Sequence, residues 1–157
     1  MEEDLIQQLI KLHAKISTAE SCTGGMLMST LINVSGASEV INEGFITYAN
    51  EAKMKYLDVK SDTLNQYGAV SEQTAREMAI GLNRQTGAQV CVSTTGIAGP
   101  LGGTLEKPVG TVYIGCYCFG KVNVKHLQLE GERYFIREQT VKEAIGFILN
   151  ELNLSQV

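Results

Sequence analysis

Residues 15–34 read KISTAESCTGGMLMSTLINV: a short apolar segment, a turn of small residues and a second apolar segment. The first segment, over residues 15–19, predicts a strand. After the turn, Leu27, Leu31 and Val34 recur at the spacing of one helix face, which predicts a helix over residues 26–34. A strand, a glycine turn and a helix in this order favour an α/β fold.

The segments on either side continue this alternation. Further helices are predicted over residues 2–13, from Asn50 to about residue 57 with Asn50 as the cap, from Ser61, from a cap at Ser71, and over residues 133–152. Further strands are predicted over residues 39–48, 89–94, 109–119 and 122–129, the last two forming a hairpin about Gly120 and Lys121. We therefore predict one three-layer α/β/α domain over residues 1–157, with a mixed, mainly parallel sheet.

The composition excludes several classes of protein. With 44% hydrophobic and 19% charged residues, the chain has the composition of a folded globular protein. A net charge of −4 without a basic block opposes direct binding to nucleic acid. No apolar run is long enough to cross a bilayer, and the acidic start MEED is unlike a signal peptide. We expect a cytoplasmic protein that does not bind membranes.

The cysteines and histidines do not suggest a metal site. The four cysteines include no C-x-x-C pair, and the two histidines are isolated in the sequence. A structural zinc ion needs four such ligands close together. We therefore expect no metal and no other cofactor, and interpret the cysteines as reduced and mostly buried.

The turn over residues 20–25 is the first candidate for chemistry. Backbone N–H groups at a strand-to-helix turn are free to bind an anion, and glycines let a ligand approach the backbone. Ser21 is the candidate nucleophile, and the N–H groups of Cys22, Thr23, Gly24 and Gly25 are the candidate oxyanion donors. Cys22 is a rival nucleophile. Alternatively, Ser21 or Thr23 only caps the helix.

The second candidate is the glycine-rich loop that follows the buried strand at residues 89–94. A long loop in a compact domain is often functional, and loops at strand ends converge in an open α/β sheet. Its hydroxyl groups and exposed amides suit a phosphate or a ribose, which makes Thr95, Gly96, Ala98 and Gly99 candidate substrate-binding residues. The alternative is a flexible crossover without a function.

Tyr48, Lys53, Arg133 and Arg137 complete the candidate set. A lysine in the first turn of a helix opposes the helix dipole, which favours its neutral form and suits a general base. Tyr48 lies at a predicted strand end and can reach the same cleft. The two arginines at the start of the last helix can bind an anion. Alternatively, Lys53 is solvated, Tyr48 packs in the core and the arginines are surface residues.

Five stretches together resemble one known family. They are TAESCTGG at 18–25, TYANEAK at 47–53, GAVS at 68–71, TGIAGP at 95–100 and KPVGTV at 107–112. In order and spacing they resemble the C-terminal domain family of the competence/damage-inducible protein CinA, also known as the nicotinamide mononucleotide deamidase family. The sequence Gly131-Glu132-Arg133 matches a Gly-acidic-Arg pattern of the family. Ala49, where the family often has serine, and Glu43-Gly44, where two glycines are frequent, are minor departures.

The resemblance implies a serine amidohydrolase that converts nicotinamide mononucleotide to nicotinate mononucleotide and ammonia, a step of NAD recycling. The catalytic roles fall on Ser21 as nucleophile, Lys53 as base and Tyr48 as assistant, and the phosphate falls near Thr95, Gly96 and Arg133, with Arg137 as the next candidate. A homo-oligomer is also expected. The alternative is a non-catalytic nucleotide-binding or adaptor module with a protein partner in DNA recombination. Many family members carry a large N-terminal domain that these 157 residues do not contain.

Overall fold

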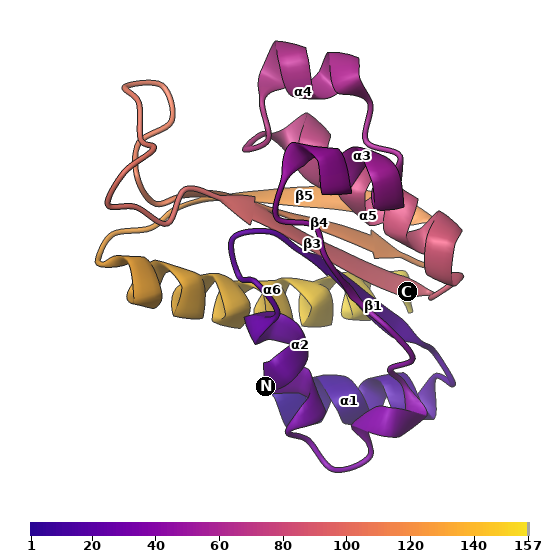
Figure 1. Ribbon diagram of the computed structural model, residues 1–157. Coiled ribbons are helices and arrows are strands. Elements are labelled where there is room, and N and C mark those ends of the chain that lie inside the picture. Colours follow the sequence, from indigo (N-terminus) through magenta and orange to yellow (C-terminus); the bar gives the residue numbers. More distant parts are fainter. Residues whose placement is uncertain (157) are drawn as a thin grey trace.

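Five strands form one mixed sheet in the order β2-β1-β3-β4-β5 (Figure 1). The computed structural model describes residues 1–156. The strands are β1 Ile16–Glu20, β2 Phe45–Ile46, β3 Val90–Gly96, β4 Thr111–Cys118 and β5 Lys121–Gln128. β1 pairs in parallel with β2 and β3, whereas β4 is antiparallel to both β3 and β5. Four strands therefore run in one direction and β4 runs against them, as predicted.

Helices cover both faces of this sheet (Figure 1). One layer holds α1 Glu2–Lys11, α2 Met26–Ile32 and α6 Arg133–Ser155, and the other holds α3 Asn50–Leu57, α4 Ser61–Tyr67 and α5 Glu72–Thr86. The predicted three-layer α/β/α architecture is confirmed. Within residues 1–156, no helix is long and apolar enough to cross a membrane.

Each helical layer encloses its own apolar core. On the α6 side, Leu5, Leu27 and Ile145 pack with the β4 residues Val112 and Ile114. On the other side, the core contains residues of α3, α5 and the strands, among them Leu57, Met78, Leu82 and Cys91. The period of two along β4 directs alternate side chains to the two layers, because successive strand residues point to opposite faces. The central strands β1 and β3 are thus buried on both faces, and their ends are the places where ligands can reach them.

The structure corrects three local predictions. The strand expected over residues 39–48 is mostly irregular: a 3₁₀ turn spans Ala37–Glu39, one bridge joins Ile41 to Ile16, and only Phe45–Ile46 are a strand. Edge position explains this, because β2 pairs only with β1. The hairpin turns at Phe119 and Gly120, one residue earlier than predicted, since both adopt positive φ. The third correction concerns Asn50, which does not cap α3.

α3 and α5 approach each other closely at one glycine. A Cβ atom added at Gly81 of α5 would lie 1.8 Å from the carbonyl oxygen of Leu57, the last residue of α3. No other amino acid fits without moving one helix. Gly81 therefore sets the distance between α3 and the rest of this layer.

Candidate active site

A polar cavity opens where β1 and β3 end. The two strands run in parallel and are paired as far as Glu20 and Thr94. The N–H group of Ser21 still donates to the carbonyl oxygen of Thr94, at 3.0 Å, so the turn after β1 begins beside the end of β3. The cavity has a volume of about 190 Å³. Its lining residues are Ser21, Cys22, Tyr48, Lys53, Ala69, Val70, Thr95, Gly96, Ala98 and Arg133.

Ser21 and Lys53 meet inside this cavity. Lys53 Nζ lies 3.1 Å from Ser21 Oγ, 2.9 Å from the carbonyl oxygen of Thr47 and 3.1 Å from that of Tyr48. Ser21 Oγ is 3.4 Å from the same Tyr48 carbonyl. Lys53 is 1% exposed and Ser21 8% exposed. The interpretation of Lys53 as a solvated surface residue is therefore excluded.

The environment of Lys53 favours its neutral form. Removal from water lowers the pKa of the Lys53 amine, and the nearby Glu51 carboxylate offsets this only partly. Lys53 forms no ion pair within residues 1–156. A neutral amine has two N–H donors and one lone pair. In the structure the amine donates to the Thr47 and Tyr48 carbonyls and to Ser21 Oγ, so loss of one proton would leave a lone pair for the Ser21 hydroxyl.

Helix α3 directs Lys53 toward Ser21. Ala49 precedes the helix with an extended backbone, and no side chain caps this end, so the predicted Asn50 cap is wrong. Lys53 is the fourth helical residue, and its N–H group donates to the carbonyl of Ala49. Because side chains on a helix tilt toward its N-terminus, the Lys53 amine reaches back to the carbonyls that precede the helix.

Tyr48 and Arg133 lie at the mouth of the cavity. The Tyr48 side chain is 63% exposed, and its hydroxyl accepts a hydrogen bond from Arg133 Nη2 at 3.3 Å. Arg133 Nη1 also donates to the carbonyl oxygen of Gly99 at 2.8 Å. Arg133 thus connects the predicted catalytic tyrosine to the loop after β3. The backbone of Tyr48, rather than its phenol, contacts Lys53.

The end of β3 is fixed in part by Thr95. Its hydroxyl donates to the carbonyl of Ala69 at 2.7 Å, which joins β3 to the segment before α5. A side chain at Gly96 would contact Val112 at 2.7 Å, so the backbone must pass close to β4 here. Thr95, Gly96 and Ala98 line the cavity, whereas Gly99 contributes its carbonyl to Arg133.

Glu20 organises the turn from within the protein. Its side chain is 1% exposed, and it accepts hydrogen bonds from the Leu27 and Met28 N–H groups at 2.8 and 3.0 Å. The hydroxyl of Thr23 donates to the same carboxylate at 2.6 Å. The carboxylate thus occupies the first turn of α2, where the helix dipole favours an anion. Neither Ser21 nor Thr23 caps α2 through its hydroxyl.

Sequence reasoning missed three residues of this region: Glu20, Ala69 and Val70. Glu20 lies inside the quoted turn, and an acidic residue shortly before a helix is a known capping signal. Ala69 and Val70 belong to the quoted stretch GAVS, but nothing in their chemistry indicates a cavity wall. Thr23, Gly24, Gly25, Gly99 and Arg137 were predicted for the site and lie around it rather than on its lining surface.

Cys22 lines the cavity but is a poor nucleophile. Burial raises the pKa of its thiol to about 11, so only about one molecule in a thousand carries the reactive thiolate at pH 8. We expect iodoacetamide to alkylate Cys22 slowly in the folded chain at pH 8 and rapidly after unfolding in guanidinium. Peptide mapping by mass spectrometry measures both rates. Equally rapid labelling of the folded chain would contradict a buried, protonated thiol.

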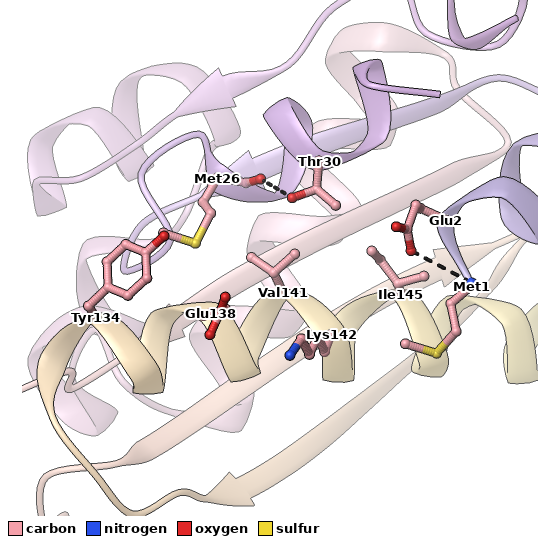
Figure 2. A pocket seen from close by; sticks show the side chains of 9 residues that line it. All are labelled: Met1, Glu2, Met26, Thr30, Tyr134, Glu138, Val141, Lys142 and Ile145. Atoms are coloured by element: carbon pink, nitrogen blue, oxygen red, sulfur yellow. Dashed lines mark hydrogen bonds and ion pairs between the residues drawn. The ribbon is translucent and has the colours of Figure 1, made fainter. Parts of the chain in front are cut away.

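A larger pocket lies elsewhere, among α1, α2 and α6 (Figure 2). It has a volume of about 310 Å³, and Met26, Val141 and Ile145 provide much of its wall. Figure 2 shows the carboxylate of Glu2 directed to the chain's own N-terminal amine. No serine, cysteine or histidine lines this pocket. The polar cavity at Ser21 is therefore the better candidate active site. Within residues 1–156, no cluster of three or more potential metal ligands is present.

Comparison with known proteins shows the family of this chain. The sequence model of the CinA C-terminal domain matches residues 1–152. The chain belongs to the CinA C-terminal domain family. It is 54% identical over 152 residues to a competence-damage inducible protein of Clostridium novyi and 52% identical to a CinA-like protein of Kosmotoga olearia. Each match covers 97% of this chain but only 37% of the relative, so the chain spans about a third of the length of these curated relatives.

Solved CinA structures share the fold. The competence/damage inducible protein CihA from Agrobacterium tumefaciens has 40% identity and a TM-score of 0.89, and the match covers 96% of this chain and 94% of that one. A CinA superfamily protein from Escherichia coli has 35% identity and a TM-score of 0.92, with 96% and 87% covered. The architecture described above is therefore that of the CinA C-terminal domain.

Proposed function

We propose that this CinA domain is an amidohydrolase that deamidates nicotinamide mononucleotide. The observation that carries the proposal is the contact between Ser21 Oγ and a buried Lys53 amine that has no acidic partner. A serine hydroxyl is a weak nucleophile until a base takes its proton. Burial lowers the pKa of the Lys53 amine, which makes its neutral form, the form that acts as a base, easier to reach.

The proposed reaction proceeds in two halves. In the first, Ser21 Oγ attacks the amide carbon and its proton moves to Lys53. The carbon–nitrogen bond then breaks, the Lys53 proton leaves with the nitrogen as ammonia, and an ester to Ser21 remains. In the second, water attacks this ester, Lys53 takes a proton from the water and returns it to Ser21 Oγ, and nicotinate mononucleotide leaves. No metal takes part in this sequence.

The turn over residues 21–25 supplies the hydrogen-bond donors for the negative oxygen. Gly24 N–H is not free for this role, because it donates to the Ser21 carbonyl at 3.1 Å. The N–H groups of Cys22, Thr23 and Gly25 have no oxygen acceptor within residues 1–156. These three are the proposed oxyanion donors, with Cys22 on the cavity lining and Thr23 and Gly25 in the turn beside it, since preorganised donors stabilise the charge that develops in the transition state.

The dimensions of the site favour a nucleotide amide over a free amide. The cavity at Ser21 shares Ala98 and Arg133 with a second cavity of about 440 Å³, which Pro100, Val109 and Tyr134 also line. A carboxamide ring in the inner cavity leaves the attached sugar and phosphate at Arg133. Arg133 has a partly exposed guanidinium there, which suits a phosphate.

Ammonia release tests the proposal directly. The purified chain should release ammonia from nicotinamide mononucleotide at a rate proportional to enzyme concentration, with nicotinate mononucleotide as the second product. Free nicotinamide, which lacks the ribose and phosphate, should react far more slowly. Binding of the mononucleotide without ammonia release would replace the enzyme with a nucleotide-binding module, and neither binding nor release would favour an adaptor.

Binding of the mononucleotide phosphate should depend on Arg133. Loss of one charge-assisted contact costs about 1.5–3 kcal/mol, so Arg133→Ala should raise KM for the mononucleotide roughly 10- to 150-fold. The effect on kcat should be smaller, because the phosphate lies away from the reacting carbon. Steady-state kinetics measure both values. Arg84→Ala, an exposed arginine of α5, is the matched control. An unchanged KM in Arg133→Ala would remove Arg133 from the site.

A further inference from the structure

Arg137 of α6 binds the backbone of the turn that carries Ser21. Its Nε donates to the carbonyl oxygen of Cys22 and its Nη2 to that of Thr23, both at 2.9 Å. Arg137 is half-buried and does not line the cavity. The turn therefore lies between the two helical layers, with Lys53 reaching Ser21 from α3 and Arg137 reaching the next two residues from α6.

These two contacts set the orientation of peptide groups. A trans peptide is planar, so its C=O and its N–H point in opposite directions. When Arg137 holds the Cys22 carbonyl, the N–H group of Thr23 in the same peptide must point away from the guanidinium. Rotation of this peptide would cost the hydrogen bond and bury an unpaired guanidinium donor.

The amide groups of α2 are not available as a substitute. The N–H groups of Leu27 and Met28 already donate to the buried Glu20 carboxylate, and that of Met26 donates to the Thr23 carbonyl. Glu20 and Arg137 thus bind opposite kinds of backbone group. The Glu20 carboxylate accepts from N–H groups at the start of α2, and the Arg137 guanidinium donates to carbonyls of the turn. Oxyanion binding is left to the turn itself.

We propose that Arg137 is a positioning residue that holds the Cys22–Thr23 peptide in the orientation required to bind the oxyanion, and that it is not a ligand of the substrate phosphate. This inference rests on the proposed amide hydrolysis at Ser21. It assigns different tasks to two arginines on the same face of α6: Arg133 binds substrate and Arg137 maintains the geometry of the turn.

The two tasks predict opposite kinetic changes. Arg137→Ala should lower kcat for the mononucleotide about 10- to 100-fold, because the oxyanion donors lose their fixed direction, and KM should stay within about twofold of the unaltered chain. Arg137→Lys should recover little activity, since a single ammonium cannot bind two carbonyls as the guanidinium does. Free guanidinium at tens of millimolar should restore part of the kcat of Arg137→Ala and none of that of Arg133→Ala.

A second measurement does not depend on the mononucleotide. An alkyl fluorophosphonate phosphonylates an activated serine: Ser21 Oγ forms a bond to phosphorus, fluoride leaves, the serine proton moves to Lys53 and the phosphonyl oxygen takes the place of the oxyanion. Mass spectrometry of the Ser21 peptide gives the rate. Arg137→Ala should label more slowly than the unaltered chain, and guanidinium should accelerate it.

The outcomes separate the inference from the proposed function. If the unaltered chain releases no ammonia but labels at Ser21, and Arg137→Ala labels slowly with guanidinium rescue, the positioning role stands and the substrate assignment fails. A raised KM with unchanged kcat in Arg137→Ala would make Arg137 a substrate ligand. A lowered melting temperature, with normal kcat per folded molecule, would reduce Arg137 to a structural role. Either result overturns the inference.

Discussion

Replacing Ser21 with alanine should abolish ammonia release from nicotinamide mononucleotide while the domain stays folded. Within residues 1–156, the hydroxyl is the only hydrogen-bond partner of Lys53 Nζ besides two backbone carbonyls. Without it, Lys53 has no nucleophile to deprotonate, so kcat should fall by roughly 10⁴-fold or more. A single-turnover ammonia assay measures the loss. Circular dichroism and the melting temperature check the fold, since the substitution removes one oxygen atom from a cavity wall.

Cys22→Ala is the control for this experiment. The Cys22 thiol lines the same cavity, but burial keeps its pKa at about 11 and the thiol protonated. Cys22→Ala should therefore keep kcat within about tenfold of the unaltered chain. An inactive Cys22→Ala beside an active Ser21→Ala would reverse the two assignments, and the serine mechanism would be wrong.

Lys53 should determine the pH dependence of the reaction. The amine acts as a base only when it is neutral, and burial lowers its pKa below the ordinary lysine value. kcat/KM should therefore be low at acid pH, rise as the pH passes this lowered pKa, and level off above it. Lys53→Met removes the amine at similar length, and Lys53→Arg keeps a charge that cannot be released. Both should lose activity by a factor on the order of 10²–10⁴.

Lys55 provides the matched control for Lys53. It lies on the exposed side of the same helix, with its ammonium over the ring of Tyr56. Lys55→Met should leave both the rate and the pH profile unchanged. A Lys53→Arg chain that keeps most of its activity would show that Lys53 acts only as a fixed positive charge, and its assignment as a base would be abandoned.

The parts of the fold that could be predicted from sequence depend on local periodicity. The unit at residues 15–34, the hairpin and the buried face of α5 have clear apolar spacing, and Ser71 caps α5 by accepting from the Thr74 N–H group, as predicted. The prediction of a strand over residues 39–48 was mostly wrong, because it rested on the high strand propensity of Phe45, Ile46 and Tyr48. Two of them form a short edge strand, and Tyr48 turns toward the cavity.

The sequence predicted the candidate site best for the residues that lie at strand ends. Ser21 follows β1 directly, and Thr95 lies in the last two residues of β3, which extends two residues beyond the predicted strand; the ends of parallel strands lie together. The targets of long side chains were not predictable. Whether Arg133 or Arg137 faces the cavity depends on where α6 crosses the sheet, and the burial of Glu20 depends on how α2 leaves the turn. These are tertiary distances that no local spacing encodes.

The close approach at Gly81 bears on how relatives of this domain should be assessed. Leu57 lies one helical turn after Lys53, so α3 transmits any outward displacement at its last residue to the lysine. A methyl group at position 81 would force α3 and α5 apart at Leu57, so we expect it to disturb the Lys53–Ser21 contact without touching either residue. A relative can therefore keep every motif of the cavity and still have lost the contact between Ser21 and Lys53. A glycine at position 81 of α5 should therefore be checked beside the serine and the lysine before the proposed activity is carried over to a relative.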